Sequence, residues 1–309
     1  MTFRPRRSVL YMPGSNERAH EKAKKLAADA LIFDLEDSIA PEEKDVAREI
    51  AAATIRSRAY GSREIVLRIN APGTEWYKHD LAAVVAAEPD AVLIPKASSP
   101  GDIMRTAKDL RELGVPEHVR LWAMMETPLA VLNADSLLRT AADPASRLAV
   151  AVVGTNDLVK EFRARLRPGR AALLPHLALC IAAARAHGVE IVDGVFNDFS
   201  DAAGFRAECE QGRDLGMDGK SLIHPSQIDA CNEVFTPPDA EIAWAHKVLH
   251  AFAQPENVGR GVLQLDGAMV ERLHVDMARR IVAIAKAIGR LPEPAADRAA
   301  SAPSAICVG

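Results

Sequence analysis

One carboxylate stands out in the sequence because its neighbours are apolar. Glu126 lies in the stretch MMETPLA, at residues 124–130, which is apolar enough to be buried. A second carboxylate, Asp157, follows an apolar run in the stretch GTNDL. Neither stretch contains histidine or cysteine, and carboxylate oxygens suit Mg²⁺, or alternatively Mn²⁺, better than Zn²⁺. We therefore predict that Glu126 and Asp157 share a divalent cation and leave coordination positions for water and substrate.

Other polar side chains end or follow further apolar runs. Arg68 and Asn70 lie at the end of the run EIVLRIN, and Lys96 ends AVLIPK. An arginine beside a metal ion is suited to binding the carboxylate of an α-keto acid and to stabilising the negative charge that forms when a carbon bond breaks. This pattern predicts aldol or Claisen cleavage, although Arg68 alone is also compatible with a structural salt bridge. Schiff-base chemistry on Lys96 is disfavoured because no acidic partner is evident in the sequence.

The elements that position these side chains are read from alternating patterns. Short β-branched runs alternate with amphipathic helical stretches, as expected of parallel strands joined by helices. The runs cover residues 8–12, 30–36, 64–70, 91–96, 120–127, 148–154, 190–196 and 220–225. Eight such units predict a closed TIM (β/α)8 barrel, whose active site lies at the carboxyl ends of the strands. A doubly wound open sheet is the rival, but PGSNE after the first run is no glycine-rich phosphate turn.

The pattern changes near residue 236. Residues 237–254 and 269–289 have helical periodicity and are joined by a glycine-containing stretch. We therefore predict a barrel at 1–235 and a C-terminal helical appendage at 236–291. Residues 292–309 are rich in Ala, Pro and Ser and are expected to form a mobile tail.

Composition narrows the function classes. The 309 residues are 49% apolar and carry a formal net charge of -4, with acidic and basic residues interspersed. This balance indicates small-molecule partners and neither nucleic acid nor a membrane. The start lacks the apolar stretch of a signal peptide, and no run approaches the ~20 residues needed to cross a bilayer, so a cytoplasmic location is expected. The four cysteines show no CxxC spacing, which argues against a zinc knuckle.

Taken jointly, a series of motifs resembles the HpcH/HpaI aldolase and citrate lyase β-subunit family, especially its malyl-CoA lyase and CitE-like branch. The motifs are RSVLYMPGS, LIFDLEDSIAPEEK, LRIN, LIPK, METP, GTNDL, VDGVFNDFSD and GKSLIHPSQI. The resemblance implies Mg²⁺ on Glu126 and Asp157, with Arg68 binding the keto acid. It also implies that Glu36 and Asp37 orient metal-bound water, although both residues also suit caps of the following helix.

The same resemblance implies coenzyme A thioesters as substrates. Tyr11, Arg18 and Lys22 are then the expected coenzyme A contacts, although the two basic residues also fit an ordinary solvated helix face. Relatives form oligomers, expected here as a trimer or hexamer, in which a neighbouring subunit delivers an aspartate for proton transfer. This chain has Glu271 at that position, and Asp266 is a second candidate in the same stretch.

The implied activity is a Mg²⁺-dependent lyase that cleaves a malyl-, citramalyl- or citryl-CoA into an acyl-CoA and an α-keto acid. Three alternatives stay open. The chain is alternatively a malyl-CoA thioesterase on the same scaffold, or a citrate lyase β-type subunit acting on an acyl carrier domain. The third alternative, an aldolase for free hydroxy-keto acids, is disfavoured by the basic segment after the first run.

Overall fold

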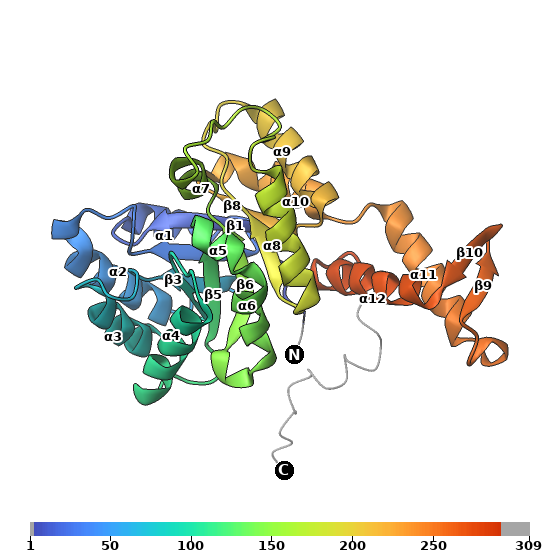
Figure 1. Ribbon diagram of the computed structural model, residues 1–309, viewed down its shortest axis with the longest axis horizontal. Coiled ribbons are helices and arrows are strands. Elements are labelled where there is room, and N and C mark those ends of the chain that lie inside the picture. The colour runs from blue at the N-terminus through green and yellow to red at the C-terminus, as the bar shows by residue number, and fades with distance from the viewer. Residues whose placement is uncertain (1–2, 292–309) are drawn as a thin grey trace, which may run out of the picture. The chain divides into compact units, whose positions relative to one another are not determined.

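Eight parallel strands close into a barrel in the computed structural model, which describes residues 3–291 (Figure 1). Each strand pairs with the next along the chain, and the last pairs with the first. The strands are β1 (Ser8–Pro13), β2 (Ala30–Asp34), β3 (Glu64–Arg68), β4 (Ala91–Ile94), β5 (Arg120–Met125), β6 (Leu148–Val153), β7 (Glu190–Asp193) and β8 (Gly219–Leu222). The predicted TIM barrel is confirmed.

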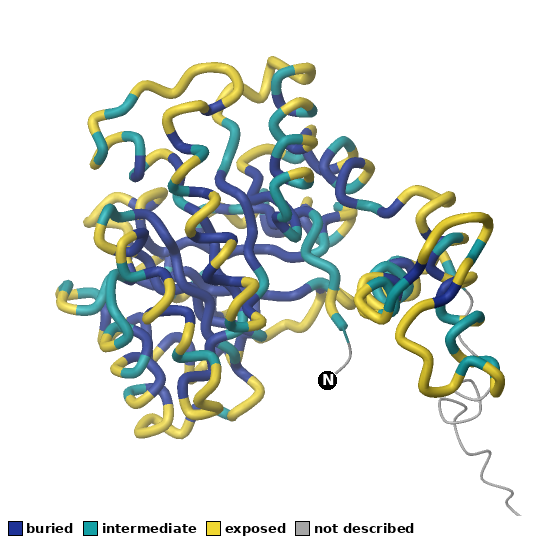
Figure 2. The backbone as a smooth tube through the Cα atoms, turned by 45° about the vertical axis from the view of Figure 1, so that its right-hand side comes forward, coloured by how far each residue is buried: buried dark blue, intermediate teal, exposed yellow. Residues whose placement is uncertain are grey.

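The barrel strands are buried on both faces. Every residue of β2, β3 and β4 is buried, because helices cover the outside and side chains fill the inside. Alternate residues point inward, and Ile32, Val66 and Trp122 belong to one apolar cluster that fills the interior. Figure 2 shows the buried backbone running through the strands, with exposed positions on the outer helices. Most strands end before the predicted apolar runs do, which leaves polar residues just beyond the strand ends.

Several helices of the barrel unit begin at local capping signals. Asn16 accepts a bond from the backbone N–H of Ala19 at 3.0 Å, and Ser99 and Asp102 form a capping box around Pro100. The helices are α1 (Glu17–Ala23), α2 (Lys44–Arg56), α3 (Tyr77–Ala87), α4 (Pro100–Glu112), α5 (Pro128–Leu132), α6 (Ala134–Arg139), α7 (Thr155–Glu161), α8 (Leu174–Ala186), α9 (Ala202–Leu215) and α10 (Ile228–Phe235).

The chain divides into two compact units. The barrel unit spans residues 6–235, and the second unit contains residues 236–291 with residues 3–5. The second unit holds α11 (Asp239–Ala253), β9 (Val262–Leu265), β10 (Ala268–Glu271) and α12 (Arg272–Ala287). The predicted mobile tail and Cys307 lie outside the described residues.

A β-hairpin in the second unit corrects the purely helical prediction for this region. Strands β9 and β10 pair in antiparallel fashion around a two-residue turn at Asp266 and Gly267, whose φ angles are 50° and 82°. Two left-handed residues at the turn suit the twist of a hairpin, and Asp-Gly is a favoured pair there. Leu263 and Val270 face each other across the hairpin and are both buried. The predicted helix over 269–289 therefore begins only at Arg272.

Within residues 3–291, each helix is too short or too polar to cross a membrane.

Candidate functional site

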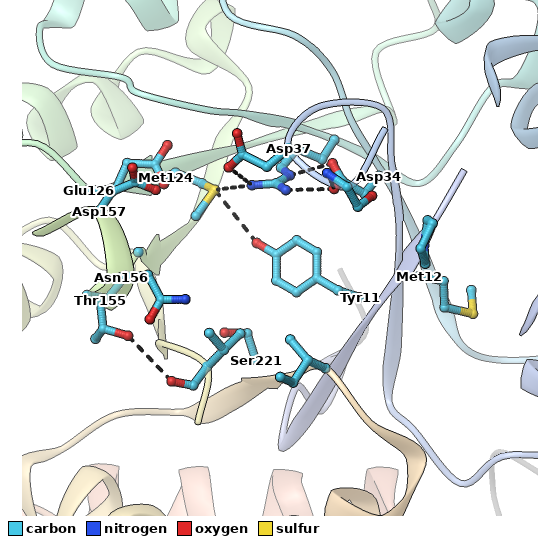
Figure 3. Close-up of a pocket in the computed structure, with 17 residues that line it drawn as sticks. Tyr11, Met12, Asp34, Asp37, Met124, Glu126, Thr155, Asn156, Asp157 and Ser221 are labelled. Carbon is cyan, nitrogen blue, oxygen red and sulfur yellow. Dashed lines mark hydrogen bonds and ion pairs between the residues drawn. The ribbon is translucent and has the colours of Figure 1, made fainter. Parts of the chain in front are cut away.

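The carboxyl ends of the barrel strands surround a cavity of about 390 Å³ (Figure 3). Its volume lies in the range of small-molecule sites. Residues from β1, β2, β3 and β5 and from the start of α7 contribute to the lining, which includes Tyr11, Asp34, Arg68, Met124, Glu126 and Asp157. Of the site residues predicted from the sequence, Tyr11, Asp37, Arg68, Glu126 and Asp157 line this cavity.

Glu126 is held in this cavity as a carboxylate with one free oxygen. It follows β5 directly, is 1% exposed, and its Oε1 accepts a bond from the backbone N–H of Lys96 at 2.7 Å. Its Oε2 is buried and has no hydrogen-bond partner among the described residues. Burial and the charge of Glu36 raise the pKa of Glu126 to about 7, against the opposing effects of the Lys96 N–H and of Arg68. A buried carboxyl group with an unused oxygen is ready to bind a cation.

Gly154 makes room for this carboxylate. A Cβ at position 154 would lie 2.5 Å from the Oε2 of Glu126 and 2.4 Å from its Cβ, closer than real Cβ atoms come. Glycine at the end of β6 therefore allows the backbone to approach Glu126, and any larger residue would displace the carboxylate.

Asp157 supplies the second predicted ligand. It lies in the first turn of α7 and lines the same cavity, where Figure 3 shows it beside Glu126. Its charge contributes to the raised pKa of Glu126, as expected for neighbouring carboxylates. Adjacent strands β5 and β6 bring these two acids together.

Arg68 is fixed by a partner that the sequence analysis missed. Its Nε and Nη2 donate to the two carboxylate oxygens of Asp34 at 2.6 and 2.7 Å. Burial would lower the pKa of Arg68, but the charge and bonds of Asp34 outweigh it and raise that pKa. Asp34 and Arg68 are register partners on β2 and β3, and both continue the inward-pointing alternation of their strands. The inward-pointing alternation along β2 is the sequence feature from which Asp34 could have been predicted as a site residue.

The remaining side of Arg68 faces a mixed environment. Its guanidinium lies 5.0 Å from the centre of the Tyr11 ring, within cation–π range. Its Nη1 lies 2.9 Å from Glu36 and 3.6 Å from the Sδ of Met124. The Tyr11 hydroxyl donates to the same sulfur at 3.7 Å (Figure 3). The guanidinium is therefore oriented before any ligand arrives.

Lys96 has an acidic partner, which corrects the inference from sequence. Its ammonium donates to Glu36 and lies 3.8 Å from Asp37. Burial would lower the pKa of Lys96, but the bond to Glu36 and the charges of Glu36 and Asp37 outweigh it and raise that pKa. A Schiff-base lysine requires a lowered pKa, so this setting disfavours such chemistry further. The left-handed backbone of Lys96, with φ 53°, turns its N–H toward Glu126.

The mouth as a whole carries more negative than positive charge. Burial raises the pKa of Glu36 against the opposing effects of Arg68 and Lys96. The acidic residues are Asp34, Glu36, Asp37, Glu126 and Asp157, and the cations among them are Arg68 and Lys96. Within the described part of the chain, no group of three or more His, Cys, Asp or Glu has the geometry of a complete metal site. The carboxylates of Glu126 and Asp157, the first with an unused Oε2, nevertheless fit Mg²⁺, which usually keeps several water or substrate ligands.

The other predicted site residues are placed as follows. Tyr11 lines the cavity. Arg18 and Lys22 are exposed on α1, four residues apart and therefore on one face. Asp266 and Glu271 lie in the second unit, where Asp266 bonds to Lys247 at 2.6 Å and Glu271 is the N-cap residue of α12. The catalytic roles of Asp266 and Glu271 stay predictions.

Comparison with known proteins identifies related sequences over nearly the whole chain. The model of the family described as HpcH/HpaI aldolase/citrate lyase matches residues 7–225. A (3S)-malyl-CoA thioesterase from Cereibacter sphaeroides (strain ATCC 17025) is 52% identical over 284 residues, which cover 92% of this chain and 96% of the relative. The citrate lyase subunit beta of Escherichia coli (strain K12) is 34% identical over 291 residues, covering 93% and 95%.

Solved structures show the same architecture. CitE from Mycobacterium tuberculosis, in complex with magnesium, acetoacetate and coenzyme A, aligns with a TM-score of 0.71 at 28% identity, covering 90% of this chain and 97% of that one. A citrate lyase beta subunit from the same organism, complexed with oxaloacetate and magnesium, aligns with a TM-score of 0.64 at 28% identity, covering 74% and 96%.

Proposed function

The chain belongs to the HpcH/HpaI aldolase/citrate lyase family, and from this membership we propose that it is a magnesium-dependent enzyme that hydrolyses a malyl-type coenzyme A thioester. The resemblance expected from the motifs is thereby confirmed. The observation that carries the proposal is the free Oε2 of Glu126, buried beside Asp157 at the mouth of the barrel. The 52% identity to a malyl-CoA thioesterase favours hydrolysis over the lyase reaction that the motifs first suggested.

Glu126 and Asp157 would hold the magnesium ion in this proposal. The bound ion would act as a Lewis acid that polarises a substrate oxygen and offsets the negative charge that develops on it. Glu36 and Asp37 would orient ordered water near the ion, a role that carboxylates beside a metal often take. Manganese is the alternative ion, because it accepts the same oxygen ligands.

Arg68 would bind the anionic end of the acyl group. Asp34 already fixes two of its nitrogens, so little side-chain entropy is lost when a carboxylate binds Nη1. Nη1 lies 2.9 Å from Glu36, and the ligand would share or replace that contact. Lys96, 42% exposed at its side chain and protonated, adds a second cation near the mouth and is the further substrate contact that we propose. Tyr11 borders the same space and would shield the acyl group from water.

The proposed reaction consumes one water molecule. Water adds to the thioester carbonyl, the carbon–sulfur bond breaks, and the sulfur takes up a proton to leave as the free thiol. Malyl-CoA and water thereby give malate and coenzyme A. We propose Glu271, supplied by a neighbouring copy in a trimer or hexamer, as the group that moves the proton, with Asp266 as the alternative.

Carbon–carbon cleavage is the second candidate. The relatives named as citrate lyase beta subunits support it, because their names denote cleavage of a carbon bond. The same cation and arginine would stabilise the enolate formed when a malyl-, citramalyl- or citryl-CoA separates into an acyl-CoA and an α-keto acid. A chain of this second kind could also require an acyl carrier domain in place of free coenzyme A.

One assay separates these reactions. Purified protein with Mg²⁺ is incubated with malyl-, citramalyl- and citryl-CoA, and free thiol and α-keto acid are measured separately. Hydrolysis releases thiol without keto acid, whereas cleavage releases keto acid without thiol. Absence of both products with all three thioesters would contradict the proposal and favour a carrier-dependent subunit.

The coenzyme A contacts are tested separately. Arg18→Gln and Lys22→Gln should raise KM for the thioester and leave kcat nearly unchanged, because the phosphates lie far from the reacting carbonyl. Arg56→Gln, an exposed basic residue at the end of α2, serves as the control. An equal KM in all variants would remove α1 from the binding site.

A further inference from the structure

A second cavity lies next to the one at the mouth. It measures about 320 Å³ and is lined by the loop that contains Leu166–Arg170 and by α9. Thr155 and Val195 line both cavities, so the two are neighbours. Leu166, Pro168 and Phe196 give the second cavity an apolar wall.

A buried ionic cluster borders this second cavity through Arg170 and Glu208. Asp193 accepts bonds from the Nη1 of Arg170 at 2.8 and 2.9 Å and from the Nζ of Lys220 at 2.9 Å. Glu208 accepts a further bond from Lys220 at 2.8 Å. Gln211 binds the Nε of Arg170 at 3.0 Å and the carbonyl of Gly169 at 2.9 Å, which anchors the loop. The cluster fixes Arg170 in place.

Among the described residues that line this cavity, the buried side-chain atom without a hydrogen-bond partner is a donor. The acidic residues of the lining have partners: Asp201 accepts from the N–H of Gly204 at 2.9 Å, and Asp198 accepts from Ser200 at 3.0 Å. By contrast, the Nη2 of Arg170 is buried and has no hydrogen-bond partner within residues 3–291, and the Arg170 side chain is 1% exposed. Arg167 also lines the cavity, and among the described residues its guanidinium has no hydrogen-bond or ion-pair partner.

We propose that this cavity, named here the loop cavity, binds a compact anion through Arg167 and Arg170. A buried guanidinium N–H without an acceptor is costly, and a carboxylate or phosphate oxygen is the acceptor that arginine binds best. The apolar wall selects an anion with a carbon skeleton or a flat group beside its charge. Two sources have this chemistry: a free organic acid and the phosphates of coenzyme A. Only the assignment to coenzyme A rests on the function proposed above.

The loop offers matched variants for the test. Arg167→Gln removes a cation that lines the loop cavity, and Arg165→Gln removes an exposed arginine two residues away that does not line it. Ala207→Leu fills the loop cavity from the exposed side of α9 and keeps both arginines, with Ala203→Leu as its control one turn earlier. None of these changes removes a buried charge, so all four variants should fold.

Calorimetric titrations with malonate, inorganic phosphate, coenzyme A and 3′-dephospho-coenzyme A then identify the ligand. We expect Arg167→Gln and Ala207→Leu to weaken binding about tenfold or more, as loss of a charge-assisted bond does, while both controls bind as the wild type does. An effect on malonate or phosphate assigns a free anion. An effect confined to coenzyme A, absent with its dephospho form, assigns the cofactor phosphate. If Arg167→Gln matches Arg165→Gln with all four probes, the proposal is wrong.

Discussion

The two ends of the barrel differ in whether their buried charged groups have partners. At the amino-terminal end, Arg6 bonds to Glu64 at 2.7 and 2.9 Å and to Glu190 at 2.5 Å, and it also lies 5.4 Å from the Trp122 ring. Arg7 bonds to Asp29 there at 2.8 Å. At the carboxyl-terminal end, five carboxyl groups lie near Arg68 and Lys96, and the Oε2 of Glu126 has no hydrogen-bond partner among the described residues.

This difference distinguishes the ion pairs that stabilise the fold at the amino-terminal end from the carboxyl groups at the mouth that are available to a ligand. Burial would lower the pKa of Arg6, but the bonds and charges of Glu64 and Glu190 outweigh it and raise that pKa, so the ion pair is strongly held. The pKa of Glu126 is also raised, but for an acid a raised pKa means that the folded protein disfavours its charge. Such perturbed groups concentrate where proteins bind or react. The charges of Arg6 and Arg7 at the amino-terminal end are therefore paired in the free protein, whereas Glu126 at the mouth keeps an oxygen without a hydrogen-bond partner among the described residues.

The largest effect on stability is expected from removing the ion pairs of Arg6 at the amino-terminal end. Arg6→Met should lower the free energy of unfolding by about 3–5 kcal/mol, because it leaves Glu64 buried without its cation. Urea denaturation measures this loss, and kcat/KM per folded molecule should stay at the wild-type value. Arg139→Met, which breaks an exposed pair with Asp135, should cost at most about 1 kcal/mol. Equal losses in the two variants would contradict the contrast between the ends.

Removing a charge at the mouth should have the opposite effect and stabilise the protein. In metal-free protein, Glu126→Gln should raise the free energy of unfolding by about 3 kcal/mol above pH 7, since the shift from 4.5 to about 7 corresponds to that energy. The sign follows from linkage: the folded state holds the proton more tightly than the unfolded state, so wild-type stability falls as pH rises from 4.5 to 7. Urea denaturation across this range should show less decline in the variant. A variant less stable than the wild type at pH 8 would show that Glu126 holds the fold together.

Arg68→Lys tests whether the geometry of the guanidinium matters beyond its charge. Lysine keeps the positive charge but has a single side-chain nitrogen. It cannot bind Asp34 with two nitrogens and reach the cavity with a third, as Arg68 does. The ratio kcat/KM should fall about a hundredfold, as when one preorganised donor is lost, and KM should rise because Arg68 is proposed to bind the anionic end of the acyl group. Steady-state kinetics measures both values, and far-UV circular dichroism checks the fold. An unchanged kcat/KM would exclude Arg68 from binding and reaction.

The smallest effect is expected in the second unit. Glu271→Asp shortens the proposed proton-transfer group by one methylene and should change kcat by about tenfold or less, because proton transfer depends on placement at the scale of an ångström. Asp266→Asn, in the turn of the hairpin, should leave kcat unchanged if Glu271 is the acting group. A larger effect of Asp266→Asn would assign the role to Asp266 instead.

The sequence predicted the barrel because its signals are local. Most strands are buried apolar runs, several helices begin at a capping residue, and polar side chains that follow strands meet at one end of a parallel barrel. The site was predictable to the same extent: Glu126, Asp157 and Arg68 meet at the mouth as their positions indicated. These arguments need only the order of the elements.

The contacts that were missed depend on register and backbone angles. Asp34 opposite Arg68 follows from strand register, and the N–H of Lys96 meets Glu126 from a left-handed backbone. The hairpin at Asp266 was hidden because its strands are four residues each, too short for periodicity to separate them from a loop. The partnerless Nη2 of Arg170 appears only after every neighbouring acceptor has been assigned.

A magnesium titration tests the central claim most directly, namely that the unpaired acids of the mouth form a cation site. Calorimetry on metal-free protein should give one ion per chain at pH 8. Binding should be about tenfold weaker at pH 6, because protonated Glu126, with a pKa of about 7, competes with the ion. Glu126→Gln and Asp157→Asn should each abolish most of this binding. Wild-type affinity that is the same at both pH values, or that survives in both variants, would contradict the account.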